Sequence, residues 1–258
     1  MKKTLLVFFV LLVSACNSGN VKTLNTRDKV TMNYMFMAHE KPAATVVLFA
    51  GGHGNLGLSG GGIDWGKNNF LVRSRELFKT HGFNVAIVDA PSDRKESHGM
   101  GYSFRNTEEH RKDIDTMIVD IRKHSNVPVW LVGTSRGTES VAYLGIHSRQ
   151  KPDGIVLTSS MAAEDDDRGE AVTELQLDKV TMPVLVMAHK EDECHKTPPD
   201  GADTIASMLV SSKKVELKYY TGGEPPESHP CKALSAHGFL GIEEKVIKDI
   251  AVFINANS

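Results

Sequence analysis

The sequence predicts an α/β fold in which helices flank a mostly parallel central sheet. Apolar, β-branched runs alternate with stretches that have the spacing of amphipathic helices, a pattern typical of such sheets. The chain has 258 residues, of which 40% are hydrophobic and 24% charged, so it is long enough for one large core. The run Val129–Val132 passes through a Gly-x-Ser-x-Gly turn directly into a segment with helical character.

The first residues have the pattern of an export signal. Lys2 and Lys3 precede the apolar run Leu5–Val13, and Cys16 follows the small residues of Val-Ser-Ala. A basic start, a short apolar run and small residues are typical of secretory signal peptides. The position of the cysteine resembles the lipobox of bacterial lipoproteins, which implies a signal peptide over residues 1–15 and acylation of Cys16.

The predicted lipidation site at Cys16 sets the boundaries expected in the rest of the chain. We expect residues 16–30 to form the lipidated N-terminus and a polar tether over Asn17–Arg27, and residues 31–258 to form one domain. Asn17 is not the aspartate associated with inner-membrane retention, so we expect an outer-membrane lipoprotein that faces the periplasm of a Gram-negative bacterium. No internal apolar run approaches the about 20 residues that a membrane span needs, so the anchor is the expected membrane contact.

The elements of the domain follow from apolar patterning. Thr31–Met37 is expected as an early edge strand, and the β-branched run Thr45–Ala50 as a buried strand that leads into the glycine-rich stretch Gly51–Gly66. Further strands are expected over Asn84–Ala90, Gly154–Ser159, Met182–Ala188 and Val215–Tyr220, besides the strand at Val129.

Helices are expected between these strands. Thr107–Ser125 is the most periodic, because Ile114, Met117 and Ile121 share one side and Thr107 is a suitable N-cap. The connection Met161–Thr181 is too short for a large cap domain. Other helices are expected over Asn69–Thr80, Thr138–Ser148, Ala202–Val210 and Ile242–Ile254.

The stretch Val127–Ser140 carries the strongest chemical signal. Ser135 stands at the tip of a strand–turn–helix, with Gly133 and Gly137 two residues to each side. A sharp turn of this kind brings backbones so close that a Cβ at the glycines would clash. The pattern resembles the nucleophile elbow of the α/β-hydrolase superfamily, and the resemblance implies that fold, without a large cap, and a nucleophilic serine.

A serine nucleophile needs a base and an acid, which follow in the order serine, acid, histidine in that superfamily. Asp192 is the predicted acid because it lies a few residues past the strand Met182–Ala188, with Glu191 and Glu193 as rivals. His237 is the predicted base. It precedes the last helix and is followed by glycine, whereas His229 in the same connection is its competitor.

Two cysteines are predicted to join these loops. If Cys16 is lipidated, Cys194 and Cys231 remain as an even pair in an oxidising compartment, where paired thiols form disulfides. Cys194 lies just after Asp192 and Cys231 just before His237. The bond would therefore restrict the acid and the histidine loops together.

Acyl transfer also requires hydrogen-bond donors for an oxyanion. The resemblance implies the backbone N–H of Arg136, directly after the nucleophile, and one from the loop after the first main strand. Gly52 N–H is the preferred second donor, with His53 next. The loop departs from the His-Gly type because Ala50 stands at the usual histidine position.

Other polar residues are weaker candidates. His53, Arg105 and His110 are predicted to contact substrate from loops at the carboxyl edge of the sheet. No cofactor is expected. A metal site is not predicted either, because the spacing of residues 189–195 matches no established metal motif.

The predicted function is a carboxylesterase-like serine hydrolase that acts on a small-molecule or acyl substrate. One alternative is a non-catalytic ligand-binding lipoprotein of the same fold. The other is a dinucleotide-binding protein, because residues 52–57 satisfy G-x-G-x-x-G and Asp89 ends the next strand. Export and the late start of the helix near Asn69 disfavour it. The net charge of −2 gives no reason to expect nucleic-acid binding.

Overall fold

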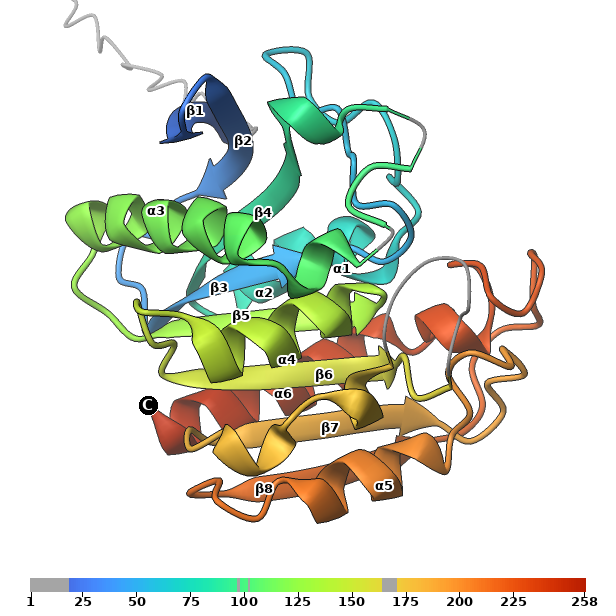
Figure 1. Ribbon diagram of the computed structural model, residues 1–258. Helices are drawn as coiled ribbons and strands as arrows, with labels where there is room; N and C mark the ends of the chain where they lie inside the picture. The colour runs from blue at the N-terminus through green and yellow to red at the C-terminus, as the bar shows by residue number, and fades with distance from the viewer. Residues whose placement is uncertain (1–18, 97, 102, 164–170) are drawn as a thin grey trace, which may run out of the picture.

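The apolar runs of the sequence form a central sheet (Figure 1). The computed structural model describes residues 19–96, 98–101, 103–163 and 171–258. Its strands are β1 (Asn20–Arg27), β2 (Val30–Met37), β3 (Ala44–Phe49), β4 (Phe83–Pro91), β5 (Val129–Ser135), β6 (Gly154–Ser160), β7 (Val184–His189) and β8 (Val215–Tyr220).

The described strands form one eight-stranded sheet in the order β1-β2-β4-β3-β5-β6-β7-β8. The β1–β2 and β2–β4 pairs are antiparallel, and all other described neighbours are parallel. Parallel neighbours require crossover connections, which helices usually supply. The predicted mostly parallel α/β sheet is therefore confirmed.

Helices cover both faces of this sheet (Figure 1). They are α1 (Phe70–Arg73), α2 (Arg75–Thr80), α3 (Glu108–His124), α4 (Gly137–His147), α5 (Gly201–Met208) and α6 (Glu243–Asn257). α3, α4 and α5 pack on one face, and α1, α2 and α6 on the other.

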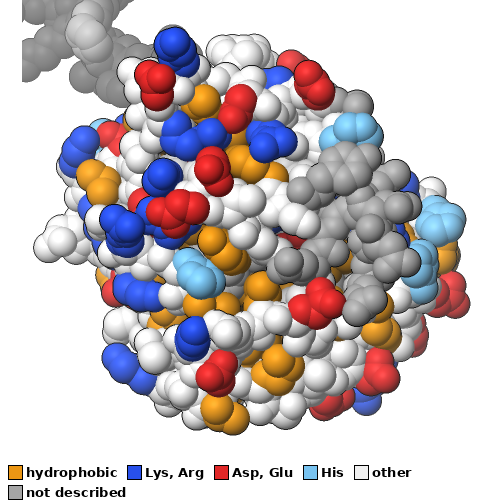
Figure 2. All heavy atoms as spheres, in the orientation of Figure 1, with side chains coloured by type: hydrophobic (Ala, Val, Ile, Leu, Met, Phe, Trp, Pro, Cys, Tyr) orange, Lys and Arg blue, Asp and Glu red, His pale blue; other side chains and the backbone are white. Residues whose placement is uncertain are grey.

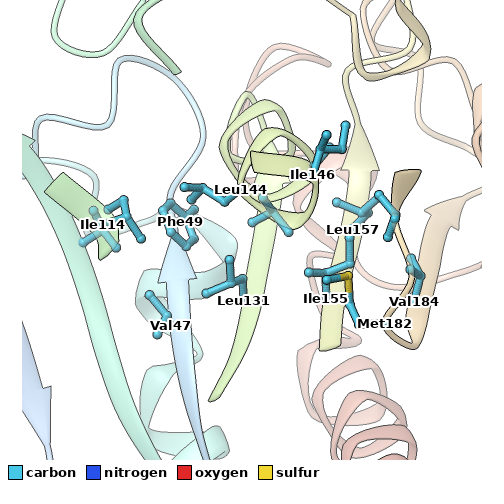
Figure 3. Packing of buried hydrophobic residues seen from close by; sticks show 14 of the residues in the cluster. Val47, Phe49, Ile114, Leu131, Leu144, Ile146, Ile155, Leu157, Met182 and Val184 are labelled. Atoms are coloured by element: carbon cyan, nitrogen blue, oxygen red, sulfur yellow. The ribbon is translucent and has the colours of Figure 1, made fainter. Parts of the chain in front are cut away.

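Residue alternation along the central strands supplies both cores. Val47 and Phe49 face the α3–α4–α5 layer, where they pack with Leu131, Ile155 and Leu157 from neighbouring strands (Figure 3). Their neighbours in sequence, Val46 and Leu48, face the opposite layer. Successive strand residues point to opposite faces, so a strand covered on both sides is apolar at every position.

The most periodic helix forms as expected. Thr107 is the N-cap of α3, and its side chain accepts a hydrogen bond from the backbone N–H of His110. Glu108 and Glu109 occupy the first turn, where negatively charged carboxylates interact favourably with the helix dipole. The stretch expected as one helix over Asn69–Thr80 instead forms two short helices, α1 and α2, separated at the buried Ser74.

Two expectations about the start of the domain are wrong. Residues 20–27 do not form a tether but strand β1, and β2 is consequently not the edge strand. Leu24 packs against the α3 side of the core and Val21 against the other side. A polar stretch can form an edge strand when only a few alternate side chains need burial.

The predicted signal peptide and Cys16 lie outside the described residues, so acylation stays a prediction. Among the described helices, none is long and apolar enough to cross a membrane.

The face formed by β1 and α3 carries mixed charges (Figure 2). Arg27 binds both Asp93 and Asp113, with N–O distances of 2.9 and 2.8 Å. Arg111 binds Glu108 within the first turns of α3. Acidic and basic side chains therefore lie side by side on this face and pair with one another.

The turn from β5 into α4 depends on two glycines. A Cβ built on Gly133 would lie 2.6 Å from the carbonyl oxygen of Gly137, and one on Gly137 would lie 2.1 Å from the carbonyl oxygen of Phe49. Both distances are far below van der Waals contact. The predicted steric need for glycine on each side of Ser135 is therefore confirmed.

Gly137→Ala should lower the free energy of unfolding by about 2–3 kcal/mol or prevent folding, because the methyl group forces α4 away from β3. Denaturant unfolding measures this change. Gly145→Ala in the same helix is the matched control, because its Cβ would lie 3.4 Å from Ile155 Cδ1, an ordinary contact. The control should be neutral or slightly stabilising, and equal stability of both variants would contradict the steric argument.

Candidate active site

A pocket of about 690 Å³ opens at the carboxyl ends of the central strands. Three segments far apart in the sequence meet there: the loop after β3 with Gly52 and His53, the turn at Ser135, and the loop before α6 with His237. Parallel strands bring the loops that follow them to the same edge of the sheet. The fold therefore brings Ser135, His237 and the loop after β3 to one cavity.

Ser135 ends strand β5 in a strained backbone conformation. Its φ is 52°, a left-handed value that costs a non-glycine residue roughly 1–2 kcal/mol. The Thr138 hydroxyl donates to the carbonyl of Ser135 at 2.6 Å and helps to hold the turn. The side chain lines the pocket and is only partly buried, so its hydroxyl is accessible to a ligand.

Asp192 lies just after β7 with its carboxylate buried and fully bonded. Oδ1 accepts from the backbone N–H of Cys194 at 3.0 Å, and Oδ2 accepts from His237 Nδ1 at 2.9 Å. The rivals Glu191 and Glu193 are exposed. Asp192 is therefore the only one of these three acidic residues that is buried and bonded to a histidine ring.

His237 belongs to the short 3-10 helix η5 (Ala236–Gly238) and is 5% exposed. Because Nδ1 donates to Asp192, the neutral ring keeps its lone pair on Nε2. Ser159 Oγ donates to the His237 carbonyl at 2.9 Å, which fixes the backbone. The competitor His229 is exposed, and its Nδ1 accepts from the nearby N–H of Cys231.

No hydrogen bond joins Ser135 Oγ to His237 within the described part of the chain. Both side chains nevertheless line the same pocket. Hydrogen bonds between a nucleophile and its base are often long before substrate binds.

Thr197 is a member of this cluster that the sequence analysis missed. Its hydroxyl, in a residue only 2% exposed, donates to Asp192 Oδ2 at 2.9 Å and lies 3.0 Å from His237 Nδ1. The signal available in the sequence was a threonine before proline in the acid loop. Thr197 bridges the acid and the histidine.

The predicted disulfide is present. Cys194 and Cys231 are bonded with a Cα–Cα distance of 4.6 Å across a sequence separation of 37. The bond joins the acid loop to the histidine loop. Arg73 makes a second link to the histidine loop, because it donates to the carbonyls of Ala233 and Gly238 and pairs with Glu243.

The loop after β3 lies directly beside the serine. A Cβ on Gly51 would lie 2.9 Å from the Cβ of Ser135. Gly52 has a φ of +63°, and Trp65 packs over it. The structure records no partner among the described residues for the N–H groups of Gly52 and His53. Arg136, the residue after Ser135, precedes the first residue of α4 and also lines the pocket.

Of the three predicted substrate contacts, only His53 lines the pocket. Its ring stacks on Trp65 with centroids 3.7 Å apart. Burial and the nearby charge of Arg105 lower the pKa of His53, so it is neutral at neutral pH.

The predictions for Arg105 and His110 are wrong, because both side chains are fully buried. His110 packs against Phe49 and Phe104, its Nε2 lies 3.0 Å from Ser140 Oγ, and burial lowers its pKa to about 3. Arg105 lies beneath the loop after β3 rather than in the pocket. Sequence position at the correct edge does not determine which way a side chain points.

Asp89 does not have the role that the dinucleotide alternative requires. It is fully buried, and its carboxylate accepts from the backbone N–H groups of Leu56 and Leu58 at 2.7 and 2.9 Å. Lys95 also binds it. Asp89 is therefore occupied in ordering the glycine-rich loop and cannot reach a ribose.

Among the described residues, no group of three or more His, Cys, Asp or Glu side chains is arranged to hold a metal ion.

Comparisons identify the fold. No family model matches the chain, and no curated protein sequence matches it significantly. An esterase from Pyrococcus furiosus aligns with a TM-score of 0.65 at 12% identity over 93% of each chain. A lid-less α/β serine hydrolase from Xanthomonas campestris aligns at 0.58, 14% identity and 93% of each chain.

An acylaminoacyl peptidase from Pyrococcus horikoshii gives a TM-score of 0.62 at 14% identity over 93% of this chain. The aligned part spans only 41% of the peptidase. At these identities the likeness shows the fold alone. The chain has the α/β-hydrolase fold, with no large cap among its described residues.

Replacing both cysteines, Cys194→Ser with Cys231→Ser, should lower the free energy of unfolding by about 3–4 kcal/mol. Without the bond, the unfolded chain gains the conformational entropy that the closed loop had removed. Denaturant unfolding of the oxidised protein and the variant measures this loss. Treating the wild type with a reductant should shift its midpoint to that of the variant. Equal midpoints of oxidised wild type and variant would contradict the stabilising role of the bond.

Proposed function

We propose that this protein is a serine hydrolase that cleaves a carboxylic ester, or a related acyl bond, through an acyl-enzyme. One observation carries the proposal: Asp192 binds Nδ1 of His237 in the wall of the pocket where Ser135 stands at a strained turn. A buried carboxylate, an imidazole and an accessible serine hydroxyl form the arrangement that activates a serine.

The proposed chemistry assigns one task to each group. His237 Nε2 takes the proton of Ser135 as Oγ attacks the acyl carbon, and it delivers that proton to the departing alcohol. A water molecule then attacks the acyl-enzyme with His237 again as base, which releases the acid and restores the serine. Asp192 holds the ring in its tautomer and stabilises the imidazolium formed in each step.

The tetrahedral intermediates carry an oxyanion that needs donors. We assign the backbone N–H of Arg136 and that of Gly52, with His53 N–H beside it. Both segments line the pocket next to Ser135. A preorganised donor of this kind is worth roughly 3–4 kcal/mol in the transition state.

The structural neighbours support an ester as substrate, because they include an esterase and a lid-less serine hydrolase. The pocket of about 690 Å³ has room for a small acyl compound. His53 and Trp65 form one wall, and Trp65 is 45% exposed, so an apolar group of the substrate could lie against it.

Export and lipid anchoring remain part of the proposal. The lipobox-like residues support acylation of Cys16, and the disulfide between Cys194 and Cys231 fits an oxidising compartment such as the periplasm. Because β1 begins at Asn20, the four residue steps from Cys16 reach at most about 14 Å. The domain would then lie close to the membrane surface.

Ser135→Ala should abolish labelling by a fluorophosphonate probe and lower kcat for p-nitrophenyl acetate by roughly 10⁴–10⁶-fold, because the nucleophile is lost. Gel fluorescence and a chromogenic assay measure both effects, and Ser148→Ala in a remote buried position is the control. A folded wild type that neither labels nor turns over any p-nitrophenyl ester from acetate to decanoate would favour a non-catalytic binding protein.

Thr197→Val should lower kcat by about 3- to 10-fold with little change in KM, because Asp192 loses one hydrogen bond while the fold keeps its shape. Steady-state kinetics measure the change. Thr197→Ser keeps the hydroxyl and should restore most of the activity. Thr116→Val, at a partly buried position of α3 remote from the pocket lining, is the control, and wild-type kcat in Thr197→Val would contradict the bridging role.

A further inference from the structure

Arg105 is a charged residue without a role in the proposed chemistry. It belongs to the 3-10 helix η2 (Phe104–Asn106), and its side chain is fully buried. Burial lowers its pKa to about 10, so the guanidinium stays charged at neutral pH. A buried cation is strongly destabilising unless its donors are bonded. The groups that Arg105 bonds therefore indicate which part of the structure the buried charge holds in place.

Those partners belong to the two segments that flank the proposed oxyanion. Nη2 donates to the carbonyls of Ala50 and Gly52 at 3.1 and 3.2 Å. Nη1 donates to Ser140 Oγ at 2.8 Å, one helical turn beyond Arg136 in α4. One guanidinium thus ties the loop after β3 to the helix that follows the nucleophile.

These bonds fix the direction of a peptide group at the pocket. In a planar trans peptide the C=O of one residue and the N–H of the next point in opposite directions. The carbonyl of Gly52 is directed to Arg105, so the N–H of His53 is turned away from it. Gly52 and His53 line the pocket and Arg105 does not, so the N–H that Arg105 orients toward the pocket is that of His53, the donor beside Gly52 N–H.

The loop is built to admit the guanidinium. Gly54 has a φ of +67°, and a Cβ there would lie 2.5 Å from Arg105 Nη2 and 2.4 Å from Met100 Cε. The backbone N–H of Met100 donates to the His53 carbonyl at 2.8 Å. Glycine at position 54 is therefore required both by the backbone conformation and by the position of Arg105.

We propose that Arg105 is a positioning residue that holds the loop of residues 50–53 in the form that binds the oxyanion. It acts through the carbonyls of Ala50 and Gly52 and does not touch the substrate. Its charge also lies close enough to this loop to lower the pKa of His53. The proposal rests on the proposed hydrolase function and adds to it the cause of the loop's preorganisation.

Arg105→Lys and Arg105→Met should lower kcat by about 10²-fold, the scale of losing one oxyanion donor, with KM nearly unchanged. A lysine keeps the charge, but its single nitrogen cannot replace Nη1 and Nη2, which bind Ser140 and the two carbonyls separately. The affinity for an alkyl trifluoromethyl ketone, which forms a tetrahedral adduct with an active serine, should fall by the same factor as kcat/KM. If Arg105 had only a structural role, its replacement would lower thermal stability, but ketone affinity and kcat/KM would not fall by the same factor.

Gly54→Ala tests the same role without removing the arginine, because its Cβ displaces the guanidinium. It should reproduce the loss of kcat. Gly57→Ala is the matched control: Gly57 has a φ of +62°, but its Cβ would meet Asp64 rather than Arg105. Arg27→Met, which breaks the ion pairs with Asp93 and Asp113, controls for loss of a structural arginine. Both controls should keep wild-type kcat.

Amide hydrogen exchange makes the test independent of turnover. The amides of Asn55 and Met100, which bond to the ring and to the carbonyl of His53, should exchange faster in Arg105→Lys than in the wild type or in Arg27→Met. If the wild type shows no hydrolysis that depends on Ser135, the proposed function fails, and the exchange rates still decide whether Arg105 holds the loop. Wild-type kcat or unchanged exchange in folded Arg105→Lys and Gly54→Ala overturns the proposal, as does failure of all Arg105 variants to fold.

Discussion

The close approach of α4 to the end of β3 is the contact on which the candidate site depends. Gly137 packs against the carbonyl of Phe49 at a distance that leaves no room for a side chain. The same approach places Gly51 against the Cβ of Ser135. Parallel pairing of β3 with β5 sets the register, with Phe49 opposite Gly133. Close backbone packing therefore places the serine and the proposed oxyanion loop next to each other.

The acid and the histidine are held by cross-links instead. Their loops leave the sheet far apart in sequence and contain little regular structure, so packing of strands and helices does not fix them. The bond between Cys194 and Cys231 and the hydroxyl of Thr197 join the two loops, and the guanidinium of Arg73 ties the histidine loop to α1. Each link lowers the conformational entropy of these loops before a substrate binds. Less entropy is then lost on binding, so the site is preorganised.

The features that the sequence predicted are those set by local sterics and periodicity. The sharp turn requires glycine at positions 133 and 137, and the apolar runs predict the strands. Side-chain direction is different, because it depends on contacts between distant segments. Arg105 and His110 lie at the expected edge of the sheet and point into the core. Thr197 stands out in the sequence only as a threonine before proline in the acid loop, and its role follows from its closeness to Asp192 and His237.

The buried charges near the pocket share one physical task. The glycine-rich loop after β3 has little regular structure, so its backbone groups need partners from elsewhere. Asp89 accepts from its N–H groups at Leu56 and Leu58, while Arg105 donates to its carbonyls at Ala50 and Gly52. An anion thus orders one end of the loop and a cation the other. Both charged groups make most of their hydrogen bonds to the backbone, which limits the conformations open to this irregular loop and makes it more rigid. That rigidity is what a binding site for a transient negative charge requires.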